Sequence, residues 1–185
     1  MTDLVLWPLD PHTGAKHAIL KLYLDRWFPI LGKYHSRINY IDGFAGPGQY
    51  QGGEKGSPVL AIESALEHVA QGTLDSNVAI NFIFVERDKD HAAHLRRVTG
   101  GISTPPQFNI SIIDGEFRDR LASILDRLEA EKKSLEPTFA FVDPFGFSGI
   151  PMSLMARILQ FQRCEVFVNI MVNFISRFLE HPNDS

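Results

Sequence analysis

Short apolar segments alternate with amphipathic segments along most of this chain. The apolar segments have the length of strands: 37–44, whose last two residues run into a glycine loop, 79–86, 108–114, 138–143 and 165–173. The segments with helical spacing lie before or between them: 16–31, 58–70, 89–98, 116–133 and 151–160. This alternation predicts an α/β fold, in which a mostly parallel sheet carries helices on both faces. Because no repeat, low-complexity tract or linker interrupts the pattern, we expect a single domain over 1–185.

The first predicted helix, 16–31, carries apolar residues in two adjacent rows. They are Ile19, Tyr23, Trp27 and Ile30, with Leu20, Leu24, Phe28 and Leu31 beside them. An aromatic stripe at helical spacing is more often core than a stacking platform, so this face is expected to be buried. Thr13 is the expected N-cap of this helix. Ser57 is the expected N-cap of 58–70, in which Pro58 takes the first position.

The composition excludes several classes of protein. The chain has 185 residues and a net charge of −4, which argues against strong non-specific binding to nucleic acid. The one cysteine, Cys164, permits no disulfide framework, and no metal site is predicted. No segment has the pattern of a signal peptide or of a membrane span. We therefore expect a cytoplasmic protein that does not contact the membrane.

Four predicted strands in succession end at an acidic residue. These residues are Asp42, Glu86, Asp114 and Asp143. In an open α/β sheet, ligands bind beyond the carboxyl ends of the strands. One acid at a strand end has little meaning, but four of them predict a shared site at that edge.

The loop after the first strand contains Gly43, Gly46 and Gly48 within the sequence YIDGFAGPGQY. Glycine permits a positive φ and lets a ligand approach the backbone closely. The spacing is G-x-x-G-x-G, and a polar stretch separates it from the next helix. The dinucleotide fingerprint is instead G-x-G-x-x-G directly at a helix. The loop therefore disfavours a nicotinamide dehydrogenase, and suits a ligand whose adenosine and amino-acid parts lie along the backbone.

Two further positions predict specific contacts to a ligand. Glu86 can accept hydrogen bonds from both ribose hydroxyls of a nucleoside. In DPFG, 143–146, either the Asp143 carboxylate or the Pro144 carbonyl can accept from a planar amine, while Phe145 stacks on its ring. The alternative for this motif is a proline that ends a strand, followed by a core phenylalanine.

Two pairs of basic residues have a functional and a structural interpretation. His91 and His94 lie three residues apart, which is typical of a metal site only if further ligands are present. A solvated helix face is the expected role. Lys16 and His17 either close over a cofactor or have a capping or surface role, and the second is the expectation.

Together these motifs resemble those of class I S-adenosylmethionine-dependent methyltransferases. More narrowly, KHAILKLYLDRW, YIDGFAGPGQYQGGEKGSP and FVDPFGF occur in the order found in the three-Cys-motif partner protein family. The resemblance implies a Rossmann-like sheet and S-adenosylmethionine as the cofactor. It also assigns roles to the residues of the predicted site. Asp42, Gly43, Gly46 and Gly48, with Phe44 in the same loop, would surround the methionine part, Glu86 would hold the ribose, and Asp114 would lie near adenine.

The resemblance leaves two functions open. DPFG is similar to the motif of methyltransferases that act on exocyclic amines of nucleic-acid bases, so Asp143, Pro144 and Phe145 would be the catalytic residues. The common form, DPPY, has a second proline, however. The family name instead implies a partner with three cysteines, and a non-catalytic binding or partner protein is the alternative.

The number of strands bears on assembly. The methyltransferase sheet usually has seven strands, whereas this chain predicts five, so we expect the C-terminal strands of that sheet to be missing. We therefore expect either an N-terminal part of a longer protein, or a partner or second copy that covers the fifth strand.

Overall fold

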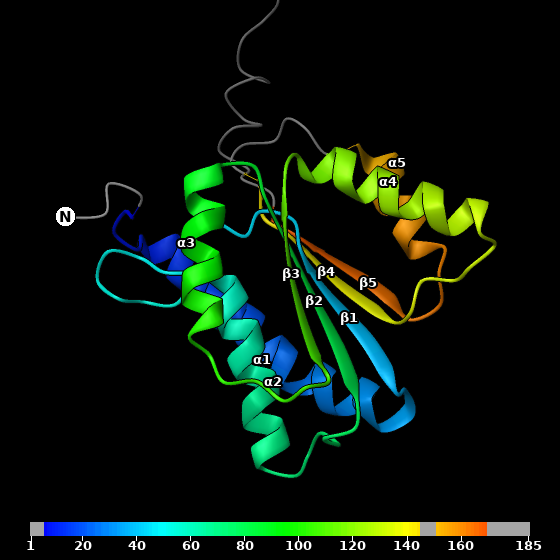
Figure 1. Ribbon diagram of the computed structural model, residues 1–185, viewed down its shortest axis with the longest axis horizontal. Coiled ribbons are helices and arrows are strands. Elements are labelled where there is room, and N and C mark those ends of the chain that lie inside the picture. Colours follow the sequence, from blue (N-terminus) through cyan, green and yellow to red (C-terminus); the bar gives the residue numbers. More distant parts are fainter. Residues whose placement is uncertain (1–5, 145–150, 170–185) are drawn as a thin grey trace, which may run out of the picture.

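The computed structural model describes residues 6–144 and 151–169, which form one parallel sheet between two layers of helices (Figure 1). The elements in chain order are α1 (Pro11–Tyr34), β1 (Arg37–Asp42), α2 (Ser57–Ala70), β2 (Ala79–Glu86), α3 (Lys89–Gly100), β3 (Phe108–Asp114), α4 (Phe117–Ala130), β4 (Thr138–Val142), α5 (Met152–Leu159) and β5 (Cys164–Val168).

The strand order is β3-β2-β1-β4-β5, and every pairing is parallel. The chain runs outward from β1 to β3 and then returns to the other side of β1 as β4. The topological switch therefore lies between β1 and β4, where open α/β sheets bind their ligands. The predicted Rossmann-like α/β fold is confirmed for the described residues, in which β3 and β5 form the two edges.

The helices form one layer on each face of the sheet. Figure 1 shows α1, α2 and α3 over one face, with α4 and α5 (Met152–Leu159) over the other. The first layer packs on an aromatic core that includes Tyr40, Phe82 and Phe139. The second layer packs on a smaller core around Ile41 and Val142. Because both faces are covered, the central strands are apolar almost throughout.

Three residues of the first helix were assigned to the wrong environment. Leu20, Leu24, Trp27 and Phe28 are buried, as expected. Ile19, Tyr23 and Ile30, which share a row with Trp27, are exposed, since the helix turns the neighbouring row toward the sheet. Tyr23 still packs one side of its ring on Phe139, and its hydroxyl donates a hydrogen bond to the Glu165 carboxylate.

Both predicted N-caps were also wrong. α1 begins at Pro11, and the Asp10 carboxylate accepts from the Thr13 backbone N–H at 2.9 Å, so Asp10 is the cap. In α2, Gly56 is the cap, and Ser57 is the first helical residue. The earlier start of α1 matters for the site, because it extends this helix to the carboxyl edge of the sheet.

A ladder of amide side chains crosses four strands. Asn109 donates to Asn81 at 3.1 Å, Asn81 donates to Asn39 at 2.8 Å, and Asn39 donates to the Thr138 hydroxyl at 3.1 Å. These residues are directly paired in the strand register. A slip of one residue would turn every member of the ladder to the other face, so the ladder favours the observed register.

One prediction concerns the C-terminal end of the described chain. The fifth strand was predicted over 165–173, whereas β5 ends at Val168 and 170–173 lie outside the described residues. Within the part of the chain that the structure describes, no helix has the length and apolar character needed to cross a bilayer.

Candidate functional site

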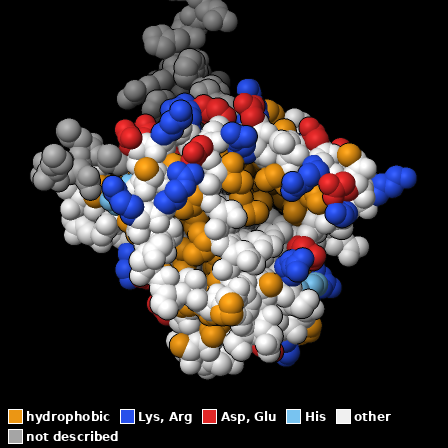
Figure 2. Space-filling model, in the orientation of Figure 1, with side chains coloured by type: hydrophobic (Ala, Val, Ile, Leu, Met, Phe, Trp, Pro, Cys, Tyr) orange, Lys and Arg blue, Asp and Glu red, His pale blue; other side chains and the backbone are white. Residues whose placement is uncertain are grey.

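Two adjoining cavities lie at the carboxyl edge of the sheet, next to the topological switch. The first has a volume of about 430 Å³ and lies between the glycine loop, the start of α1 and the end of β4. The second has a volume of about 610 Å³ and lies over the ends of β2 and β3. Four residues line both cavities: Trp7, Phe44, Gly46 and Pro144. On the face shown in Figure 2, hydrophobic side chains gather in a depression between α3 and α4, with charged side chains around it.

Backbone hydrogen bonds hold the glycine loop against the strand ends. The Gly43 N–H donates to the Phe141 carbonyl at 2.9 Å, and the Ala45 N–H donates to the Val85 carbonyl at 3.1 Å. The loop is thereby fixed to both neighbours of β1. This anchoring presents one backbone segment to both cavities.

The three glycines of this loop have different physical roles. A Cβ at Gly43 would lie 2.8 Å from the Phe117 ring, and one at Gly48 would lie 2.6 Å from the Leu95 side chain. Gly46 has a φ of +61°, and a Cβ there would meet no atom within 4 Å. Gly43 and Gly48 therefore permit close packing, whereas Gly46 leaves open space where the two cavities join.

Glu86 is nearly buried at the end of β2 and lines the second cavity. One carboxylate oxygen accepts from the Gly46 N–H and the other from the Asp88 N–H, each at 2.7 Å. These two bonds fix the orientation of the carboxylate. Each oxygen keeps a second lone pair, so the group can also accept from a ligand.

Asp42 lies beneath the loop and lines neither cavity. Complete burial raises its pKa to about 7, and the charges of Asp143 and Glu86 act in the same direction. The Ser57 hydroxyl and the Phe44 N–H oppose this rise by stabilising the carboxylate. Oδ1 accepts from the Phe44 N–H at 3.1 Å, whereas Oδ2 makes no regular hydrogen bond to the described residues. Asp42 therefore shapes the loop from below.

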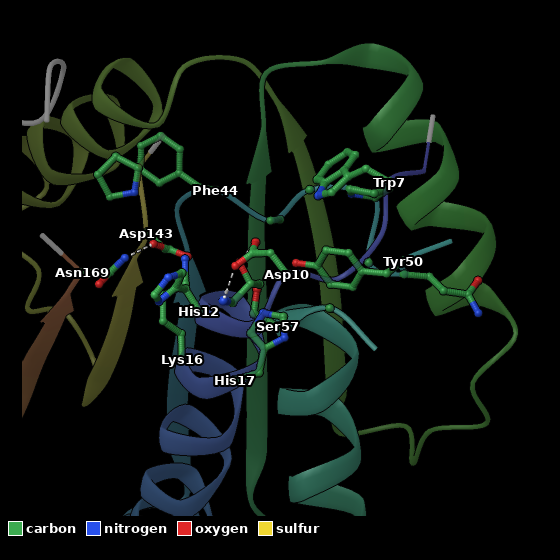
Figure 3. Close-up of a pocket in the computed structure, with 18 residues that line it drawn as sticks. Trp7, Asp10, His12, Lys16, His17, Phe44, Tyr50, Ser57, Asp143 and Asn169 are labelled. Atoms are coloured by element: carbon green, nitrogen blue, oxygen red, sulfur yellow. Dashed lines mark hydrogen bonds and ion pairs between the residues drawn. The ribbon is translucent and has the colours of Figure 1, made fainter. Parts of the chain in front are cut away.

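Asp143 follows β4 and occupies the wall of the first cavity, where two side chains hold it. Its Oδ2 lies 2.6 Å from the Lys16 ammonium, and its Oδ1 accepts from the Asn169 amide at 2.7 Å. Figure 3 shows Lys16 and Asn169 meeting Asp143, with Trp7 and Tyr50 farther along the cavity. The expected capping or surface role of Lys16 and His17 was wrong, because both side chains are largely buried in the site. Phe145 lies outside the described residues.

Asp114 lies apart from the other strand-end acids. Its carboxylate is half exposed and pairs with Arg96 at 2.6 Å, and it lines neither cavity. The next residues, Gly115 and Glu116, line the second cavity instead. Three of the four strand-end acids therefore converge on the switch region, while the fourth faces the neighbouring helix.

The pattern of acids and glycines in the sequence does not indicate several residues that line the first cavity. They are Trp7, Asp10, His12, His17, Tyr50 and Asn169, all of which line the first cavity. Burial lowers the pKa of His17 to about 4, and the charge of Lys16 adds to the effect. Burial raises the pKa of Tyr50 to about 12, and Asp143 adds to that effect. The sequence Asp10-Pro11 is a helix-start signal. It could have shown that the helix begins early enough to bring His12 and His17 to the strand ends.

The two histidines of α3 have unequal environments. His94 is buried, and its ring nitrogen lies 2.9 Å from the Pro47 carbonyl, so the expected solvated face was wrong for this residue. His91 lies beside Glu86, with 3.8 Å between the ring nitrogen and the carboxylate. In 6–144 and 151–169, no three His, Cys, Asp or Glu side chains are grouped so that they could hold a metal ion.

No protein-family model matches the chain, and no curated protein matches it in sequence. The functional assignment therefore rests on the residues of the site themselves.

Proposed function

We propose that this chain is an S-adenosylmethionine-dependent methyltransferase. The observation that carries the proposal is the pair of cavities that meet at Gly46 on the carboxyl edge of the sheet. A ligand that spans both must have two different ends. One cavity offers the Glu86 carboxylate to a sugar, and the other offers the Lys16 and Asp143 charges to an amino acid.

The residues present fit this cofactor. Glu86 has lone pairs to accept from ribose hydroxyls, and its carboxylate is already oriented by two backbone N–H groups. The N-terminus of α2 at Ser57 offers its dipole to a carboxylate in the first cavity, beside the Lys16–Asp143 pair. The open space at Gly46 leaves room for the atoms that join the two ends.

When bound, S-adenosylmethionine supplies an electrophilic methyl group, so the protein has to position the acceptor rather than provide a nucleophile. The proposed acceptor is an exocyclic amine of a nucleic-acid base. The Pro144 carbonyl has the polarity to accept from such an amine, and Pro144 lines both cavities. Asp143 would take part through the oxygen that now accepts from Asn169.

Transfer of a labelled methyl group tests this proposal. The chain would be incubated with methyl-labelled S-adenosylmethionine and, separately, DNA, RNA and protein pools. The proposal predicts label in a nucleic-acid pool and its loss in Asp143→Ala. Glu67→Ala is the control, because this exposed acid pairs with Lys21 away from the cavities. Label that persists in Asp143→Ala would contradict the role of the motif.

One observation favours a second function, that of a non-catalytic binding or partner protein. Lys16 and Asn169 already engage both oxygens of Asp143, so this carboxylate has partners within the chain before any amine arrives. This function predicts binding of the cofactor with no label in any pool. The partner would be a protein with three cysteines, or a second copy that pairs along β5, which contacts only β4 in the described sheet.

A further inference from the structure

Trp7 lies where the two cavities meet, although it belongs to neither the glycine loop nor a strand end. It is one of the four residues that line both cavities. Among these, Phe44 and Trp7 are the aromatic ones. A ligand that fills both cavities therefore passes close to Trp7.

The position of Trp7 is fixed by contacts on both sides. Its carbonyl accepts from the Gln51 N–H at 3.0 Å, which ties it to the far end of the glycine loop. Its ring lies edge-on to Tyr50, with centroids 6.0 Å apart, and at 5.2 Å from the His91 ring. The indole therefore has a set place between the loop and α3, which reduces the entropy cost of using it in recognition.

We propose that the Trp7 indole recognises the positive charge at the midpoint of the ligand, the sulfonium of S-adenosylmethionine. This inference rests on the proposed function, since it assumes that the adenosine and amino-acid ends occupy the two cavities. The negative face of an indole attracts a cation, and tryptophan is the strongest of the aromatic side chains in this respect. The neutral thioether of S-adenosylhomocysteine lacks this attraction, so Trp7 makes the site prefer the charged cofactor to the product.

The acids that line the cavities, among them Asp10, Glu86 and Asp143, also attract a cation. These acids are present both in the wild-type chain and in a Trp7 variant, so their attraction for a cation is the same in both. The change in preference when Trp7 is replaced therefore reports on the indole.

The test compares the affinities of S-adenosylmethionine and S-adenosylhomocysteine for the same chain by calorimetry. In Trp7→Leu, the affinity for S-adenosylmethionine should fall about 3- to 20-fold more than that for S-adenosylhomocysteine. Trp7→Phe should lose part of that difference. Tyr34→Leu is the control, because this exposed aromatic residue lines neither cavity, and both affinities should stay unchanged.

The outcomes separate this inference from the proposed function. If the wild-type chain binds both ligands and Trp7→Leu lowers both affinities by the same factor, the role of Trp7 is overturned. The cofactor assignment then stays intact. If the folded wild-type chain bound neither ligand, the proposed function itself would fail, and the inference with it. If Trp7→Leu did not fold, Trp7→Phe would decide. A ratio of the two ligand affinities that is unchanged from the wild type in Trp7→Phe would overturn the inference.

Discussion

The ammonium of Lys16 and the carboxylate of Asp143 lie 2.6 Å apart, although 127 positions separate them in the chain. The pair joins the first turns of α1 to the end of β4 and closes one side of the first cavity. It therefore connects the stability of the fold with the geometry of the site.

Replacing Lys16 by methionine should destabilise the chain by about 1–3 kcal/mol, because Asp143 would remain largely buried without its cation. Urea unfolding measures this free energy. Lys133→Met is the control, since Lys133 pairs with Glu131 on the surface and its loss should cost less than about 0.5 kcal/mol. Equal stability of Lys16→Met and the wild type would contradict the structural role of the pair.

The pKa of Asp42 predicts a particular dependence of stability on pH. A folded-state pKa of about 7, against about 4 in the unfolded chain, means that the folded state binds this proton more tightly. Stability from this group is therefore present at low pH and is lost as the pH rises from about 4 to 7.

Asp42→Asn removes this titration. The free energy of unfolding of the variant minus that of the wild type should therefore increase between pH 4 and 7 and level off above it. Urea unfolding at several pH values measures the difference, in which the other titrating groups largely cancel. A difference that is constant with pH would show that the Asp42 pKa is not raised.

Substitutions of Gly46 and Gly48 should have different effects on the stability of the fold and on ligand binding. Gly46→Ala should cost about 1 kcal/mol through its positive φ, because the new methyl group meets no atom, yet it should weaken ligand binding in both cavities. Gly48→Ala should cost about 2 kcal/mol or more, because its Cβ would overlap the buried Leu95 side chain. Thermal unfolding and calorimetry measure the two effects, and the reverse order of stabilities would contradict this division.

The amide ladder predicts that its members contribute unequally to the free energy of unfolding. Asn81→Ala removes two ladder bonds and leaves the buried Asn39 oxygen without its donor, so it should cost about 1–3 kcal/mol. Asn109→Ala removes only the exposed end of the ladder and should cost about 1 kcal/mol or less. Equal costs, measured by urea unfolding, would mean that the ladder does not act as a connected unit.

Much of the fold and part of the site follow from the sequence pattern. Apolar runs that end in acids predict parallel strands, and they correctly bring Asp42, Glu86 and Asp143 to one edge. The same pattern could not separate Asp114 from this group, because its partner Arg96 depends on how α3 packs beside β3. Nor could it show that Lys16 reaches Asp143, since that contact requires α1 to begin at Pro11 and to cross the carboxyl edge.

The most direct test of the central claim is calorimetric titration of S-adenosylmethionine into the chain, with NAD as the control ligand. The claim predicts micromolar binding of S-adenosylmethionine, no comparable binding of NAD, and a loss of affinity in Glu86→Ala but not in Glu67→Ala. Binding of NAD alone, or no binding of S-adenosylmethionine by the folded chain, would contradict it.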